Sequence, residues 1–95
     1  MAIDVECRLF GPFRDAAGVE TEVRETDAET VGDLLRELEL TYPNLDGQLI
    51  DEEREEIAGS TVVTRAKTDV RHLDGVDTAL ADGDVIRLVP SVYGG

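Results

Sequence analysis

This sequence holds very little of several residue types on which protein chemistry commonly depends. It contains one cysteine, one histidine, one lysine and no tryptophan. A single cysteine excludes an internal disulfide and fits a reducing compartment. No apolar run approaches the roughly 20 residues of a membrane-spanning helix, and the N-terminus lacks the basic start and apolar stretch of a secretory signal. We therefore expect a cytoplasmic domain that does not enter a membrane.

Basic residues are scarce relative to acidic ones. The chain carries 22 aspartates and glutamates against 9 lysines and arginines, which gives a formal net charge of −13. Nucleic-acid binding requires cations that neutralise phosphates, so we expect no direct contact with DNA or RNA. Two interpretations of the acidity stay open: a carboxylate-rich surface adapted to high salt, or an acidic face for basic partners. Strong acidity with a single lysine resembles the proteins of halophilic microbes.

The motifs of the common enzyme classes are missing as well. The chain contains no GxSxG, P-loop, GxGxxG or HExxH pattern. The one histidine, His72, stands beside a predicted turn, where exposure to solvent is a commoner outcome than a role as general base. The acidic segment 51–56 lacks the glycine and the alternating ligands of a calcium loop. We therefore predict a protein that is not itself an enzyme and that binds neither a metal ion nor a cofactor.

Alternation of apolar and polar residues predicts strands near the start of the chain. Within residues 3–10, the apolar side chains at positions 3, 5, 7 and 9 share one side, as in a half-buried strand. Cys7 is therefore expected to be buried, whereas Phe10 falls on the polar side. Gly11-Pro12 ends this strand, and alternation resumes over residues 19–23. The two strands are predicted to form a hairpin with an unusually long connection.

A helix is predicted to follow. Thr30 with Asp33 three residues later is a helix-start signal, because these side chains can satisfy free backbone N–H groups. Apolar residues then recur at helical spacing, at Val31, Leu34, Leu35, Leu38 and Tyr42. Pro43 ends the helix at or before the preceding residue. Gly32 in the first turn lowers helix propensity by about 1 kcal/mol without reversing the prediction.

The second half of the chain predicts shorter elements. Residues 45–50 are expected to form a short helical turn, residues 61–63 a strand, and residues 70–73 a short strand at most. Residues 85–89 are apolar enough for a final, central strand. The order β-β-α-β-(β)-β places one helix on one face of a sheet, an α+β architecture. We expect a single domain over residues 1–90 and a C-terminal tail over residues 91–95.

The tail carries the strongest functional signal. It ends in Gly94-Gly95, five residues beyond Pro90, and an extended segment of that length reaches about 17 Å. Glycine has no side chain and accepts most backbone angles, so Gly94 would let the tail enter a narrow channel. A terminal carboxyl is an anion at neutral pH and a poor electrophile. ATP-dependent adenylation would make it reactive toward a sulfur or amine nucleophile.

Three segments together resemble a known family. Leu9 to Gly18 is similar to the family pattern LFA-x-LRE-x-AG. Thr30 to Leu35, continuing to Tyr42-Pro43, is similar to its helix TVGDLL…YP. Asp74-Gly75 through Ala81 to Val85 and on to Gly94-Gly95 matches its third segment. The chain therefore resembles the small subunit of molybdopterin synthase, the ThiS-like thiamin sulfur carriers and the small archaeal modifier proteins, which are ubiquitin-like.

The resemblance implies a ubiquitin-like β-grasp fold, with a mixed sheet of four to five strands and one main helix on one face. It also implies an ubiquitin-activating-like partner enzyme that uses ATP to adenylate Gly95. In the carrier branch, Gly95 becomes a thiocarboxylate whose sulfur a molybdopterin synthase large subunit uses. In the modifier branch, Gly95 is joined to lysines of target proteins. Tyr93 departs from the pattern, because many carriers have a small residue there.

Other roles stay open within and outside that resemblance. Some relatives supply sulfur to tRNA, and a β-grasp domain can also be a non-covalent interaction module with idle glycines. The sequence does not separate a carrier from a modifier, because both need the same tail and the same activation.

Two further sites are predicted around the tail and on the surface. A partner-docking patch is expected at Phe10 and Val89, with Leu73 as a third member, because exposed apolar groups near a working end are suitable interface anchors. The alternative is that these residues lie at the edge of the core. Lys67 is the one side-chain amine that could accept another copy's Gly95, and the alternative there is a solvated lysine with no such role.

Overall fold

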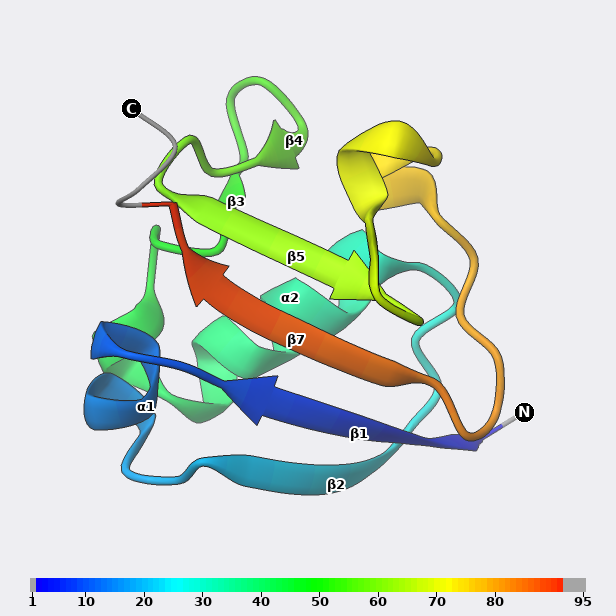
Figure 1. Ribbon diagram of the computed structural model, residues 1–95, viewed down its shortest axis with the longest axis horizontal. Helices are drawn as coiled ribbons and strands as arrows, with labels where there is room; N and C mark the ends of the chain where they lie inside the picture. Colours follow the sequence, from blue (N-terminus) through cyan, green and yellow to red (C-terminus); the bar gives the residue numbers. More distant parts are fainter. Residues whose placement is uncertain (1, 92–95) are drawn as a thin grey trace.

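Five strands of this protein form one mixed sheet in the order β2-β1-β7-β5-β6 (Figure 1). The computed structural model describes residues 2–91. Its strands and helices, in chain order, are β1 (Ile3–Leu9), α1 (Pro12–Ala17), β2 (Thr21–Thr26), α2 (Val31–Thr41), η1 (Pro43–Leu45), β3 (Ile50–Asp51), β4 (Glu56–Ile57), β5 (Thr61–Arg65), β6 (Thr68–Asp69), η2 (Val70–His72), η3 (Gly75–Asp77) and β7 (Val85–Pro90). Among residues 2–91, no helix combines the length and apolarity needed to cross a membrane.

The final strand, β7, lies at the centre of the sheet. It pairs in parallel with β1 and antiparallel with β5. The predicted central position of this strand is confirmed, and so are the mixed sheet and the α+β class. Ile86 and Leu88 are fully buried, whereas Val85, Arg87 and Val89 alternate with them. One face of β7 therefore belongs to the core, and the other belongs to the face of the sheet that α2 does not cover.

Helix α2 covers the inner face of the sheet, behind the strands in Figure 1. The Thr30 hydroxyl accepts a hydrogen bond of 3.2 Å from the Asp33 backbone N–H, which caps the helix as predicted. Its buried side is formed by Val31, Gly32, Leu34, Leu35 and Leu38. The helix ends at Thr41, two residues before Pro43. The apolar stripe read from the sequence is the stripe that packs on the sheet.

The inner face of β1 follows the predicted alternation. Val5, Cys7 and Leu9 are buried in the core. Cys7 is fully buried, and burial, with a smaller contribution from the charge on Glu22, raises the pKa of its thiol to about 12. Because the thiolate is the reactive form of cysteine, this residue is a structural part of the core at neutral pH.

The connection between β1 and β2 is a helix, where the sequence predicted a long loop. Pro12 occupies the first turn of α1, where its missing N–H leaves no gap in the hydrogen bonding. Gly18 ends the helix with φ of 80°, and its N–H donates to the Arg14 carbonyl. Phe13 is buried against the core. A helix of six residues is too short to show the periodicity that identifies helices in a sequence.

Three shorter elements also differ from expectation. Residues 70–73, predicted as a short strand at most, contain the 3₁₀ helix η2, and the strand β6 lies just before it at Thr68–Asp69. The helical turn expected over residues 45–50 occurs earlier, at Pro43–Leu45. The acidic segment 51–56 joins β3 to β4, which form a separate two-stranded ribbon. Elements of two or three residues carry too little pattern to be placed from sequence.

Strand β2 turns polar side chains toward α2. Thr26 is buried, and Val23, on the opposite parity, is 68% exposed. Arg24 donates to Glu22 at 2.6 Å and to the Thr41 hydroxyl at 2.9 Å, so it joins the sheet to the end of α2. Charged groups that face inward on an edge strand discourage pairing with another chain. These polar contacts therefore hold the edge strand β2 against α2, and they also protect this edge from pairing with another chain.

Gly32 explains how closely α2 approaches the second half of the chain. A Cβ atom at this position would lie 3.0 Å from the Val76 Cβ and 3.0 Å from the Val76 carbonyl oxygen. Glycine in the first turn therefore permits contact between α2 and η3. The isolated bridge from Thr30 to Ala79 lies beside this contact.

Candidate functional site

The last described residue, Ser91, is fixed at the end of β7. Its backbone N–H donates to the Ser60 carbonyl at 2.9 Å, and its hydroxyl donates to the Gly59 carbonyl at 3.3 Å. These bonds continue the pairing of β7 with β5 by one residue, because Pro90 is opposite Thr61. The predicted working residues Gly94 and Gly95, and the atypical Tyr93, lie outside the described residues. The position of Ser91, the last described residue before them, is nevertheless defined.

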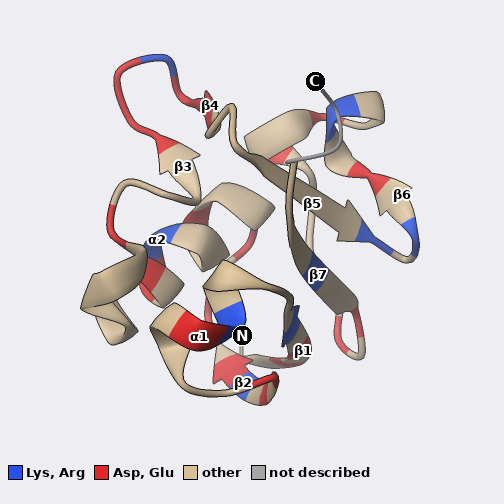
Figure 2. Cartoon of the chain, turned by 60° about the vertical axis from the view of Figure 1, so that its left-hand side comes forward, with Lys and Arg blue, Asp and Glu red and all other residues tan. Residues whose placement is uncertain are grey.

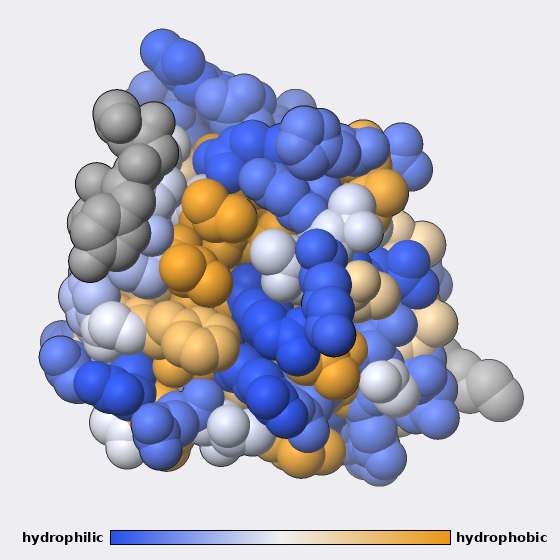
Figure 3. Space-filling model, viewed as in Figure 1, coloured by the Kyte–Doolittle hydropathy of each residue, from blue (hydrophilic) through white to orange (hydrophobic). Residues whose placement is uncertain are grey.

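An apolar cluster lies on the uncovered face of the sheet beside this point. It consists of Phe10, Val62 and Val89, and we call it the apolar cluster below. Val62 and Val89 are opposite each other on β5 and β7. Phe10 follows β1, which is in register with β7 at Leu9 and Leu88, and it is 41% exposed. Figure 3 shows apolar side chains gathered on this face over the start of β5 and the end of β7, bordered by hydrophilic ones.

The structure brings together two of the three residues predicted for a docking patch. Phe10 and Val89 belong to the apolar cluster. Leu73, 43% exposed, follows η2 on the other side of β5 from β7 (Figure 1). Val62 was assigned only to a strand, because pattern alone did not show its pairing with Val89. The signal that could have found it is its parity, which is opposite to that of the buried Val63.

The loop before α1 touches the end of β7. Gly11 has φ of 57°, a value that favours glycine. A Cβ atom at this position would lie 3.3 Å from the Pro90 Cγ, so the glycine also permits a close approach. The first of the three recognised sequence segments is thus packed against the base of the tail, although the two are far apart in the chain.

Lys67 lies at the opposite end of β5 from the tail. Ala66 and Lys67 have φ of 51° and 72° and form the turn between β5 and β6, as in the primed turns of tight hairpins. Lys67 is exposed. The five residues of β5 separate the turn from Ser60, the residue that Ser91 contacts, and a strand of that length spans about 17 Å.

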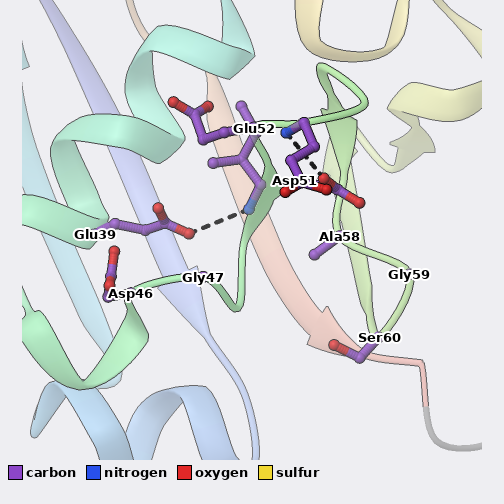
Figure 4. Close-up of a pocket in the computed structure, with 10 residues that line it drawn as sticks. Glu39, Asp46, Gly47, Asp51, Glu52, Ala58, Gly59 and Ser60 are labelled. Atoms are coloured by element: carbon purple, nitrogen blue, oxygen red, sulfur yellow. Dashed lines mark hydrogen bonds between the residues drawn. The ribbon is translucent and has the colours of Figure 1, made fainter.

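Acidic side chains around a surface hollow between α2 and β3 have structural partners. Figure 4 shows the Glu39 carboxylate pointing at the start of β3, where it accepts from the Leu49 and Ile50 backbone N–H groups at 3.0 and 3.2 Å. Asp51 likewise accepts from the Glu53 N–H at 3.1 Å. Among residues 2–91, no three histidine, cysteine, aspartate or glutamate side chains converge closely enough to hold a metal ion. These carboxylates cap backbone N–H groups.

The geometry defines a class of protein: a β-grasp domain of the ubiquitin-like type, with its last strand central and an apolar cluster beside the departing tail. The comparison with protein families places the chain within that class. Residues 7–95 match the ThiS family, and the protein belongs to that family.

Individual relatives agree with this assignment. The chain is 40% identical over 94 residues to small archaeal modifier protein 3 of Haloferax volcanii, covering 98% of this chain and 100% of the relative. The solution structure of small archaeal modifier protein 1 from Methanosarcina acetivorans superposes with a TM-score of 0.84 at 32% identity, covering 100% of this chain and 99% of that one. A putative molybdopterin converting factor subunit 1 from Pyrococcus furiosus superposes with a TM-score of 0.74 at 25% identity, covering 93% and 97%. The predicted fold and family are confirmed, and the protein is a ubiquitin-like relative of sulfur carriers and protein modifiers.

Proposed function

We propose that the reactive group of this protein is the α-carboxyl of Gly95, which a partner enzyme activates with ATP. The observation that supports the proposal is the family match, which extends through Gly95. In the activating step, a carboxylate oxygen attacks the α-phosphorus of ATP and pyrophosphate leaves, so that an acyl adenylate forms. A nucleophile then attacks the carbonyl carbon and AMP leaves. The protein itself supplies the carboxylate and a surface for docking, and ATP belongs to the enzyme.

The nucleophile decides between two fates of the activated carboxyl. Attack by sulfide, with AMP as the leaving group, gives a thiocarboxylate, whose sulfur a molybdopterin synthase large subunit would incorporate into molybdopterin. Attack by a lysine amine of a target protein gives an isopeptide bond. The likeness to a molybdopterin converting factor subunit supports the first fate, and the 40% identical modifier protein supports the second. We propose both, with sulfur supply to tRNA as the alternative use of the same thiocarboxylate.

The apolar cluster is the proposed docking surface for the activating enzyme. Its residues are exposed or half-buried on a face that no other part of residues 2–91 covers, and they adjoin the anchored Ser91. Phe10→Ala and Val89→Ala should each weaken binding of the enzyme while the melting temperature changes little. Leu40→Ala is the matched control, because Leu40 is 83% exposed on the outer side of α2. Leu73→Ala tests whether the surface extends beyond β5.

Intact-mass analysis of the protein isolated from its source organism tests the reactive group. A thiocarboxylate adds the mass difference between sulfur and oxygen at the C-terminus, and conjugates are detected as branched peptides in which a target lysine carries the C-terminal residues of this protein. A variant without Gly94 and Gly95 should show neither product. A variant extended by one alanine after Gly95 is the sharper control, because it keeps both glycines and moves the carboxyl. Thiocarboxylate or conjugates formed normally by either variant would refute the proposal. An unmodified protein that still binds partners through the apolar cluster would instead indicate a non-covalent interaction module.

A further inference from the structure

Two arginines lie side by side on the uncovered face of the sheet. Arg8 of β1 is directly in register with Arg87 of β7. Both alternate with core residues, because Leu9 and Leu88 on the neighbouring positions are buried, so both side chains belong to the uncovered face. The basic segments of β1 and β7 are adjacent in Figure 2, in a molecule whose charged segments are mostly acidic.

This arrangement is unfavourable within the domain itself. Like charges directly opposite each other on neighbouring strands destabilise a sheet. Arg8 is partly neutralised, because its Nε donates to Glu6 Oε2 at 2.5 Å. Arg87 takes part in none of the ion pairs or side-chain hydrogen bonds among residues 2–91, whereas every other arginine there has a carboxylate or carbonyl partner. The chain has 22 acidic residues, yet within the described residues none of them pairs with Arg87 on this face.

A third polar group in the same row is also unsatisfied. Thr64 of β5 is in register with Arg87. Its Oγ1 is buried and has no hydrogen-bond partner within residues 2–91. Buried polar groups are nearly always hydrogen-bonded, so an unsatisfied one requires an explanation. The row from Arg8 to Thr64 therefore has hydrogen-bonding capacity that the described fold does not use.

The row adjoins the apolar cluster. Phe10 is two residues beyond Arg8, and Val89 is two residues beyond Arg87, on the same face in each case. Two residues along a strand cover about 7 Å. A protein that docks on the apolar cluster would thus also cover the two guanidinium groups, which are suited to binding carboxylates in a bidentate manner.

We propose that Arg8 and Arg87 bind an acidic side chain on the protein that docks at the apolar cluster, namely the activating enzyme of the proposed function, on which this inference rests. Charge complementarity identifies the occupant. A polyanion such as RNA is disfavoured because it would meet a net charge of −13 around only two cations. A symmetric contact with a second copy is disfavoured because it would bring four arginines together across the axis.

Charge reversal of Arg87 tests the inference. Arg87→Glu changes the net charge from −13 to −15, since a positive charge is replaced by a negative one. Arg54→Glu makes the same change at an exposed site in the β3–β4 ribbon, where the Arg54 side chain is 76% exposed, so it is the matched control. Arg87→Gln removes the charge alone and serves if the reversal unfolds the domain. Affinity for the source organism's adenylating enzyme and the rate of adenylation are measured at low and high salt.

We expect Arg87→Glu to weaken binding by about tenfold or more relative to Arg54→Glu, as for a charge at an interface. This loss of affinity should be smaller at high salt. The rate of adenylation at a saturating concentration of the variant should be unchanged, because Gly95 is intact. Equal losses in the two reversals would refute the inference, since only net charge would then matter. If the wild type bound a pool of tRNA and Arg87→Glu did not, the inference would also be refuted, because the arginines would then bind RNA and not an acidic side chain of a protein. Failure of the wild type to be adenylated would refute the proposed function instead.

Discussion

The glycine at the start of α2 gives a prediction in which two physical effects oppose each other. Helix propensity alone predicts that Gly32→Ala stabilises the protein, by at most about 1 kcal/mol. The structure predicts the reverse, because the new Cβ would lie 3.0 Å from both the Val76 Cβ and the Val76 carbonyl oxygen. These atoms belong to the backbone of η3 or are attached to it, so they cannot move by rotating a side chain.

The expected balance is a loss of stability. Overpacking of this kind costs about 1–3 kcal/mol, which exceeds the gain in propensity and leaves a net loss of about 1 kcal/mol. For a domain of this size, that lowers the melting temperature by about 4–8 °C. Urea unfolding at constant high salt measures the change.

Gly59→Ala is the matched control for this measurement. A Cβ at Gly59 would have no neighbour within 4 Å, and the substitution restricts the unfolded chain. It should therefore be neutral or stabilise by about 0.5 kcal/mol. A Gly32→Ala protein that is more stable than the wild type would show that propensity dominates and that the contact between α2 and η3 is loose.

Three other predictions concern charge and reactivity. Stability should fall as salt is removed, because a net charge of −13 repels itself more when the Debye length grows from about 3 Å at 1 M to about 30 Å at 0.01 M; thermal melts that do not vary with salt would assign the acidity to partners. Burial raises the pKa of Cys7 to about 12 from about 9, so the folded state holds this proton more tightly than the unfolded state. The resulting stability is complete below pH 9 and should be lost progressively toward pH 12, and urea unfolding of Cys7→Ala should show a weaker dependence over that range. If the protein is joined to itself, Lys67→Arg should abolish isopeptide-linked self-conjugates and spare conjugates with other proteins, because arginine does not lose its proton to act as an amine nucleophile; mass spectrometry that still finds such self-conjugates would contradict the assignment.

Long elements with a regular pattern were predictable from the sequence. In β1 the apolar residues alternate with polar ones, and in α2 they recur at helical spacing. Each element has one regular period, and that period alone indicates which of its side chains are buried. Helix α1 was not predicted because its six residues, which begin with Pro12 directly after Gly11, are equally compatible with a loop. The inward charges of β2 were not predictable either, because Arg24, which bonds Glu22 within its own strand, has its further partner in the Thr41 hydroxyl at the end of α2, far along the chain.

The candidate site was only partly predictable. The sequence indicated Phe10, because its parity differed from that of the core residues. It did not reveal that Arg8 and Arg87 are neighbours, since register between β1 and β7 joins residues far apart in the chain. The same holds for the contact of Gly11 with Pro90. Sequence patterns locate the strands, but pairing across the sheet determines which chemistry is assembled on its face.

The parallel pairing of β1 with β7 has a mechanical consequence. Both arrows point the same way in Figure 1, so the start of β1 and the end of β7 lie at opposite ends of the sheet. Tension between these two points would load their evenly spaced hydrogen bonds together in shear, so that the bonds could not open one by one. We therefore expect the domain to resist extension from its ends more strongly than peeling of β2 from the edge. Force spectroscopy in the two geometries would measure that difference, and a conjugated copy of this protein would be a stiff link between whatever pulls on its two ends.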